Sequence, residues 1–215
     1  MGALARLAAL TAAFALALST PAVAQPPLSD HAVLYGFEPF GTFEVNPTRA
    51  LVAHLSKGHP QRTQAVLSVS PEDAMGHLYA LMAERPRAII GFGVRADVQD
   101  IEVNTAATNW LAMRSESSTP YFGAIDPGLP TSISLPGPWR DTVASHLQAS
   151  RVPHTLSPDA GLHACNLTFF QALVHAPAGA RVLFVHVAPD IMQRPDLLRA
   201  LETFVDALLT PDRIP

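Results

Sequence analysis

The chain has 215 residues, of which 48% are hydrophobic and 15% are charged, and its formal net charge is -4. This length suits one domain with a sizeable core. Mild acidity without a run of lysine or arginine excludes nucleic acid and anionic membrane surfaces as the main partners.

The first 24 residues have the pattern of a secretory signal peptide. Arg6 gives a positive start, an apolar run covers 7–18, and small residues at 22–24 form a cleavage site before Gln25. Loss of Arg6 with this leader changes the net charge from -4 to -5. The apolar run is short for a bilayer span, although a retained anchor is the alternative. We therefore expect an exported protein, periplasmic or secreted.

The remaining residues, 25–215, alternate strand and helix patterns. In chain order we expect a strand over 31–37, a helix over 47–55, a strand over 64–69, a helix over 71–85, a strand over 87–91, a tight turn at Gly93, an alternating strand over 100–109, a polar loop over 114–130, a short strand over 133–135, a helix over 138–149, a strand over 154–156, a helix over 165–175, a strand over 181–187 and a helix over 194–209. Strands separated by helices indicate a single three-layer α/β domain with a mainly parallel sheet. No later stretch is long and apolar enough to span a membrane.

Two helix starts carry local signals. Asn46 is an N-cap candidate because Pro47 follows it at the first helical position. Ser70 stands in the same relation to Pro71, and two acids follow in the first turn.

Polar residues also lie where several expected strands end. In the alternating stretch, Glu102 and Asn104 share one face of the strand. Four places lie near the carboxyl ends of expected strands: the loop after the first strand, the segment near Asn104, the loop before Cys165, and His186 itself. Since ligands of open α/β sheets bind at those ends, a shared site is expected there.

Cys165 is the only cysteine of the chain, and it opens a predicted helix. His186 ends a predicted buried strand. A thiolate nucleophile, a helix N-terminus that lowers its pKa and an imidazole that carries the proton are what a thiol hydrolase needs. Exported proteins usually pair their cysteines, so one retained thiol favours a function over the alternative of a small buried hydrophobic residue.

Three motifs in chain order resemble the pyroglutamyl peptidase I family, cysteine peptidases that remove an N-terminal pyroglutamyl residue. The motifs are Gly36-Phe37-Glu38-Pro39-Phe40-Gly41 followed by Val45-Asn46-Pro47, then Ser157-x-x-Ala160-Gly161-x-x-x-Cys165-Asn166, then Phe184-x-His186-Val187. The resemblance implies that Cys165 is the nucleophile and His186 the general base. It also implies that Phe37 and Phe40 hold the flat lactam ring and that Arg114 lies near the nucleophile. Family members are usually cytoplasmic, so the leader is a departure.

The third catalytic position is a second departure. The family has a glutamate there, eleven residues after a glycine that matches Gly93 and five before an asparagine that matches Asn109. Both spacings lead to Asn104, whereas Glu102 takes this place if the register shifts by two. An asparagine can hold an imidazole in the right tautomer but supplies no negative charge. A reduced or altered peptidase is therefore expected, and a lactam-binding protein with impaired catalysis is the alternative.

No metal or cofactor is expected. The nine histidines include no HExxH or paired HxH motif. Gly91-Phe92-Gly93 lacks the third glycine of a dinucleotide fingerprint. The expected partner is a peptide or a small cyclic amide, and the sequence leaves the oligomeric state open.

Overall fold

The computed structural model describes residues 26–41, 44–113 and 120–210. Six strands form the main sheet: β1 (Ser29–Phe37), β2 (Arg62–Leu67), β3 (Pro86–Val94), β4 (Ile101–Asn104), β9 (His154–Ser157) and β10 (Arg181–Val187). The helices are α2 (Pro47–Ser56), α3 (Pro71–Ala83), α4 (Gly137–Ser150), α5 (Ala164–His175) and α6 (Pro195–Leu209), with a 3-10 turn at Ile191–Gln193. Two small sheets pair β5 (Ala106–Thr108) with β8 (Ser132–Ser134) and β6 (Leu111–Met113) with β7 (Tyr121–Gly123).

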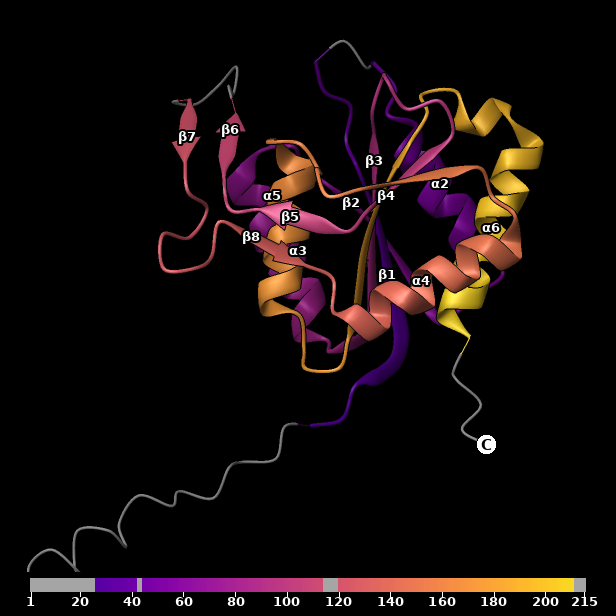
Figure 1. Cartoon of the computed structure of the whole chain (residues 1–215), viewed down its shortest axis with the longest axis horizontal. Coiled ribbons are helices and arrows are strands. Elements are labelled where there is room, and N and C mark those ends of the chain that lie inside the picture. Colours follow the sequence, from indigo (N-terminus) through magenta and orange to yellow (C-terminus); the bar gives the residue numbers. More distant parts are fainter. Residues whose placement is uncertain (1–25, 42–43, 114–119, 211–215) are drawn as a thin grey trace, which may run out of the picture.

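The main sheet is mainly parallel and has the strand order β2-β1-β3-β10-β4-β9. Strands β2, β1, β3 and β10 run parallel to one another, β4 runs antiparallel to β10, and β9 runs parallel to β4. Figure 1 shows α3 and α5 on one face of this sheet and α2, α4 and α6 on the other. The expected three-layer α/β fold is therefore confirmed. Among the described helices, none combines the length and apolar character needed to cross a membrane.

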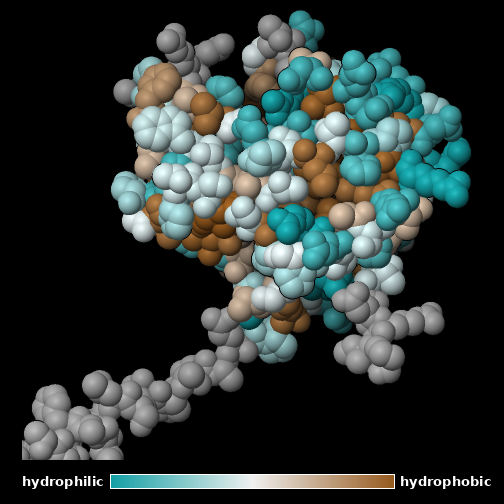
Figure 2. Space-filling model, in the orientation of Figure 1, coloured by the Kyte–Doolittle hydropathy of each residue, from teal (hydrophilic) through white to brown (hydrophobic). Residues whose placement is uncertain are grey.

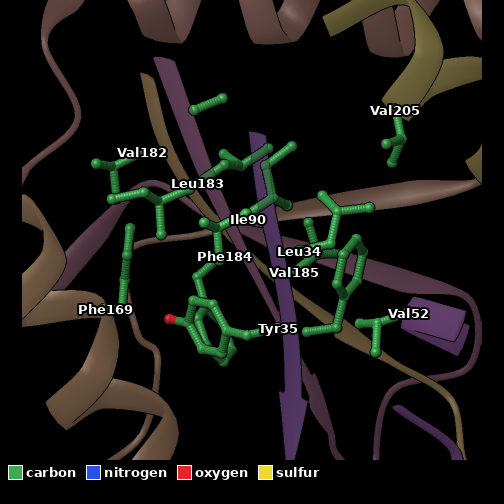
Figure 3. Close-up of a cluster of buried hydrophobic side chains, with 14 of the residues drawn as sticks. Leu34, Tyr35, Val52, Ile90, Phe169, Val182, Leu183, Phe184, Val185 and Val205 are labelled. Atoms are coloured by element: carbon green, nitrogen blue, oxygen red, sulfur yellow. The ribbon is translucent and has the colours of Figure 1, made fainter. Parts of the chain in front are cut away.

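The core lies on both faces of the central strands. Neighbouring residues of a strand point to opposite faces, so Tyr35 and Phe184 lie toward Phe169 of α5, while Leu34 lies toward Val52 of α2 (Figure 3). All five side chains are at most 1% exposed. Aromatic rings therefore fill the face of the sheet that α5 covers.

The stretch 100–109 is not one strand, which corrects the expectation. The chain leaves the main sheet at Thr105, whose backbone N–H donates to the Ser157 carbonyl at 2.7 Å and whose carbonyl accepts from the Leu135 N–H at 2.8 Å. The residues after it pair with β8 instead. Gly93 is likewise not a turn, because it lies inside β3 and pairs with His186 of β10.

The expected loop over 114–130 contains part of an ordered hairpin. Strand β7 pairs antiparallel with β6, and the residues that join them, 114–119, lie outside the described residues. Strands of three residues give too short a pattern for sequence periodicity to detect.

The two capping expectations have different outcomes. Asn46 caps α2, since its Oδ1 accepts from the Thr48 backbone N–H at 3.1 Å and from the Thr48 hydroxyl at 2.8 Å. Ser70 stands at the N-cap of α3 but makes no side-chain bond to the helix backbone; its hydroxyl lies 3.2 Å from Glu72 Oε2. The first motif thus begins its helix with a fully engaged cap.

Candidate active site

The candidate site is built over Gly93 on the face of β3 that α5 covers. A Cβ atom at Gly93 would lie 2.8 Å from Cys165 Sγ, 2.9 Å from His186 Cδ2 and 3.0 Å from Phe184 Cε1. The thiol of α5 and the imidazole of β10 therefore both approach the same point of β3. Only a glycine leaves room for both, and this is the close backbone approach that glycine in a strand permits.

Cys165 is the second residue of α5 and is half-buried. The first N–H groups of a helix have no partner inside the helix, so they are free to donate to an acceptor in front of it. The side chains of Phe169 and Phe170, on the following turn, are fully buried and anchor the helix on the sheet. The thiol is thus presented by a rigid helix start.

Asn166 fixes the start of α5 to the neighbouring small sheet. Its Oδ1 accepts from the Thr108 backbone N–H at 2.9 Å, and its Nδ2 donates to the carbonyls of Thr108 at 2.9 Å and Trp110 at 3.0 Å. This side chain is fully buried, and its amide oxygen and both of its N–H groups are hydrogen-bonded. The residue after the thiol therefore holds the helix in position.

His186 is buried and oriented by Asn104. Its Nδ1 lies 2.8 Å from Asn104 Oδ1. The Nδ2 group of Asn104 donates to the Asp159 carbonyl at 2.8 Å and to Glu102 Oε1 at 3.1 Å, which assigns Nδ2 to that side of the amide and Oδ1 to the ring. Because the amide oxygen can only accept, Nδ1 carries the proton and Nε2 is left free to accept one.

Glu102 lies next to this hydrogen bond. Its Oε1 lies 3.6 Å from His186 Nδ1 and accepts from Arg95 Nη1 at 2.9 Å. The neighbouring His186 ring, followed by the Asn104 amide and the Arg95 charge, holds the pKa of the Glu102 carboxyl below its usual value despite partial burial. Both candidates for the third catalytic position, Asn104 and Glu102, therefore lie next to His186 Nδ1.

The route by which Asn104 reaches His186 differs from the one expected. Strand β4 is antiparallel to β10, so its carboxyl end does not lie at the carboxyl edge of the parallel strands. Glu102 pairs directly with His186, and Asn104 pairs with Phe184, two residues before it. Asn104 thus approaches the ring diagonally, from deeper in the sheet.

Burial dominates the protonation of the thiol. It raises the pKa of Cys165 to about 12, against smaller lowering effects of the residue's own backbone N–H and of the Arg95 charge. The backbone N–H at the helix start lowers this pKa, as expected, but burial outweighs it, because removal from water costs the thiolate more than the helix start returns. The resting thiol is protonated and depends on a base.

The remaining candidates are Phe37, Phe40 and Arg114. Phe37 is 1% exposed and packs edge-on against Tyr35 and tilted against Phe184, whereas Phe40 is partly exposed. Of the two, Phe40 is the one with surface to offer a ligand. Arg114 lies outside the described residues.

Sequence reasoning missed Arg95, the role of Gly93 and the anchoring by Asn166. A glycine inside an apolar strand pattern signals a close approach, so Gly93 could have been found. Arg95 carries no such signal, because its contacts with Glu102 and with the distant Asp159 form only when the chain has folded.

A cleft of about 540 Å³ lies between α3, α5 and the β6–β7 pair, and Leu167, two residues after Cys165, belongs to its lining. Its lining residues are Pro71, Glu72, Met75, Leu111, Met113, Pro120, Tyr121, Ile125, Leu167 and Gln171. Figure 2 shows hydrophobic side chains in two places on the viewed face, one toward the lower left and one right of the centre, among hydrophilic ones. Within the described ranges, no three His, Cys, Asp or Glu side chains are grouped to hold a metal ion.

Substitution Gly93→Ala tests the close approach. We expect the added Cβ to displace Sγ or the imidazole and to lower the free energy of unfolding by about 1–3 kcal/mol, as overpacking does. The control is Gly76→Ala in α3, where a Cβ meets nothing within 4 Å; it should stabilise the fold by about 0.5–1 kcal/mol. Chemical denaturation measures both, and equal stability of Gly93→Ala and wild type would contradict the crowding.

The raised thiol pKa predicts an unusual alkylation profile. Below its pKa, a thiol gains about tenfold thiolate with each pH unit, so the rate of Cys165 alkylation by iodoacetamide should still rise beyond pH 9 in the folded protein. In denaturant the same thiol should level off near its ordinary pKa of 9.0. A rate that shows no further rise beyond pH 9 in the folded state would refute the effect of burial.

Comparisons with known proteins point to one family. The sequence profile of the pyroglutamyl peptidase family matches residues 30–194. Pyrrolidone-carboxylate peptidase of Brevibacillus brevis is 29% identical over 189 residues, covering 80% of this chain and 86% of that protein. The Thermococcus litoralis protein of the same name is 26% identical over 170 residues, covering 74% and 77%.

The solved structures include a similar fold. The crystal structure of pyrrolidone carboxyl peptidase from Thermus thermophilus superposes with a TM-score of 0.70 at 27% identity, covering 82% of this chain and 99% of that one. Together with the family profile, which spans most of the chain, these similarities show that the chain belongs to the pyroglutamyl peptidase family of cysteine-type omega peptidases.

Proposed function

We propose that this chain removes an N-terminal pyroglutamyl residue, or a related cyclic amide, from peptides through a thioester on Cys165. The observation that carries the proposal is the convergence of the Cys165 thiol and the His186 imidazole over Gly93. The orientation of the imidazole by Asn104 supports the same reading, because it leaves Nε2 unprotonated.

The reaction follows from the proton positions. His186 Nε2 takes the proton of the thiol, and Sγ attacks the carbonyl carbon of the pyroglutamyl residue. The oxyanion of the tetrahedral intermediate is stabilised by N–H groups at the start of α5. The imidazolium returns the proton to the leaving amine, the thioester remains on Cys165, and a water molecule activated by His186 hydrolyses it to free pyroglutamate and thiol.

The burial of the site suits an uncharged substrate. A pyroglutamyl ring is flat and carries no charged amine, so its burial costs less than that of an ordinary N-terminus. In this proposal Phe40 contacts the lactam ring. Phe37 packs in the core against the rings of Tyr35 and Phe184.

Hydrolysis of pyroglutamyl-7-amino-4-methylcoumarin tests the function. We expect fluorescent amine from wild type and a loss of about 10³-fold or more in kcat for Cys165→Ala and His186→Ala, because nucleophile and base act as a unit. The control is His163→Ala, an exposed histidine at the N-cap of α5, which should change kcat by less than about twofold. Turnover that survives Cys165→Ala would refute the thiol mechanism.

The alternative of a lactam-binding protein gives a different result in the same assay. A pyroglutamyl ligand would then raise the melting temperature of wild type while no amine is released. Substitution Asn104→Glu, which places a carboxylate against His186, should in that case create activity.

We also propose that the protein is exported, on the strength of the leader pattern over residues 1–24. In a bacterial host that processes such leaders, the mature protein should accumulate outside the cytoplasm and begin at Gln25. Fractionation followed by N-terminal mass spectrometry measures both properties. An unprocessed chain in the cytoplasmic fraction would contradict export.

A further inference from the structure

We propose that Glu102 and Asn104 act as one orienting unit for His186, in which the amide supplies the hydrogen bond and the carboxylate supplies the negative charge. The inference rests on the proposed function and makes Glu102 a positioning residue. From the sequence, these two residues were alternatives for one position. In the structure both act on His186: Asn104 contacts the ring, and Glu102 contacts Asn104 and lies close to the ring.

The amide end of the unit supplies the hydrogen bond to the ring. Asn104 is fully buried, its Oδ1 accepts from His186 Nδ1, and its Nδ2 is engaged by the Glu102 carboxylate and the Asp159 carbonyl. A rotated amide would turn Nδ2 toward the Nδ1–H donor and Oδ1 toward two acceptors. Glu102 and the Asp159 carbonyl together therefore fix which end of the amide faces the ring.

The carboxylate end brings the charge that an asparagine lacks. Glu102 Oε1 is 3.6 Å from His186 Nδ1, and the side chains of the two residues are only 14% and 4% exposed. A negative charge at this distance, partly shielded from water, stabilises the imidazolium that forms when His186 takes the thiol proton. Glu102 remains ionised, because the same neighbours lower its pKa.

Arg95 keeps the carboxylate in place. Its Nη1 donates to Glu102 Oε1 and, at 3.3 Å, to the Asp159 carbonyl, so it joins Glu102 to the loop that also binds Asn104. Its Nε donates to Asp97 at 3.1 Å, which offsets part of its charge.

The charged environment of Glu102 is otherwise simple. The titratable and charged side chains that face it come from β10, with His186, and from the segment after β3, with Arg95. Strand β9 places the uncharged Thr155 opposite it in register. Among the described residues, Arg95 is therefore the cation that competes with His186 for Glu102, and it is itself paired with Asp97.

The test compares Glu102→Gln with Glu102→Asp and with Glu84→Gln. Gln keeps the size of the side chain and removes the charge, whereas Asp keeps the charge. Glu84→Gln makes the same charge change at an exposed carboxylate that pairs with His31, so it controls for net charge. Each variant is assayed for kcat and KM over pH, per mole of protein shown to be folded by thermal unfolding.

We expect Glu102→Gln to lower kcat about ten- to a hundredfold, with KM changed less than about twofold. The acid limb of its kcat/KM profile should move to lower pH, because the protonated imidazole loses a stabilising charge. Glu102→Asp should keep most of the activity, and Glu84→Gln should match wild type. An unchanged kcat or acid limb in Glu102→Gln, or equal losses in Gln and Asp, would overturn the proposal.

A second readout separates this inference from the proposed function. If wild type does not hydrolyse the pyroglutamyl amide, the function fails while the orienting unit is still tested by alkylation of Cys165 with iodoacetamide at pH 7. That reaction draws on transfer of the thiol proton to His186, so Glu102→Gln should slow it about tenfold. Equal alkylation rates in the two proteins would overturn the unit.

Discussion

The hydrogen bond between His186 and Asn104 is the interaction on which the site depends. It joins β10 to β4 inside the protein, where an unpaired imidazole N–H or amide would be costly. It also sets the proton on Nδ1, without which Nε2 could not accept the proton of the thiol. The Asp159 carbonyl and Glu102 complete the amide, so the loop before α5 and the face of β4 are held by one side chain.

The second constraint is space at β3. Cys165 and His186 belong to different elements, α5 and β10, and their side chains meet because Gly93 has no side chain. Gly91 has the same relation to Tyr35, whose ring would clash with a Cβ there at 2.4 Å. The two glycines thus let aromatic and reactive side chains lie directly on the backbone of the central strand, under the cover of α5.

Much of the fold followed from local pattern, and much of the site did not. Alternating apolar segments predicted the layers because each helix and strand carries its own periodicity. Strand direction is not a local property, so the reversal of β4 was missed, and with it the diagonal approach of Asn104 to His186. Glu102 and Asn104 could not be separated, since both residues lie on one face of one strand.

For Cys165, the position could be predicted from the sequence but the pKa could not. Its place at a helix start was predicted correctly, yet the pKa of Cys165 depends on how completely α5 and β3 exclude water. Arg95 is a further example, because its partners meet it only in the folded chain. Properties set by tertiary burial and long-range pairing were therefore beyond the reach of sequence pattern.

The raised pKa of Cys165 has a consequence for the lifetime of the protein. Oxidation to a sulfenic acid and exchange with a disulfide both start from the thiolate, which burial keeps scarce. The scarcity of thiolate therefore slows both reactions at the unpaired Cys165. The burial that disfavours ionisation of the Cys165 thiol thus also slows its oxidation.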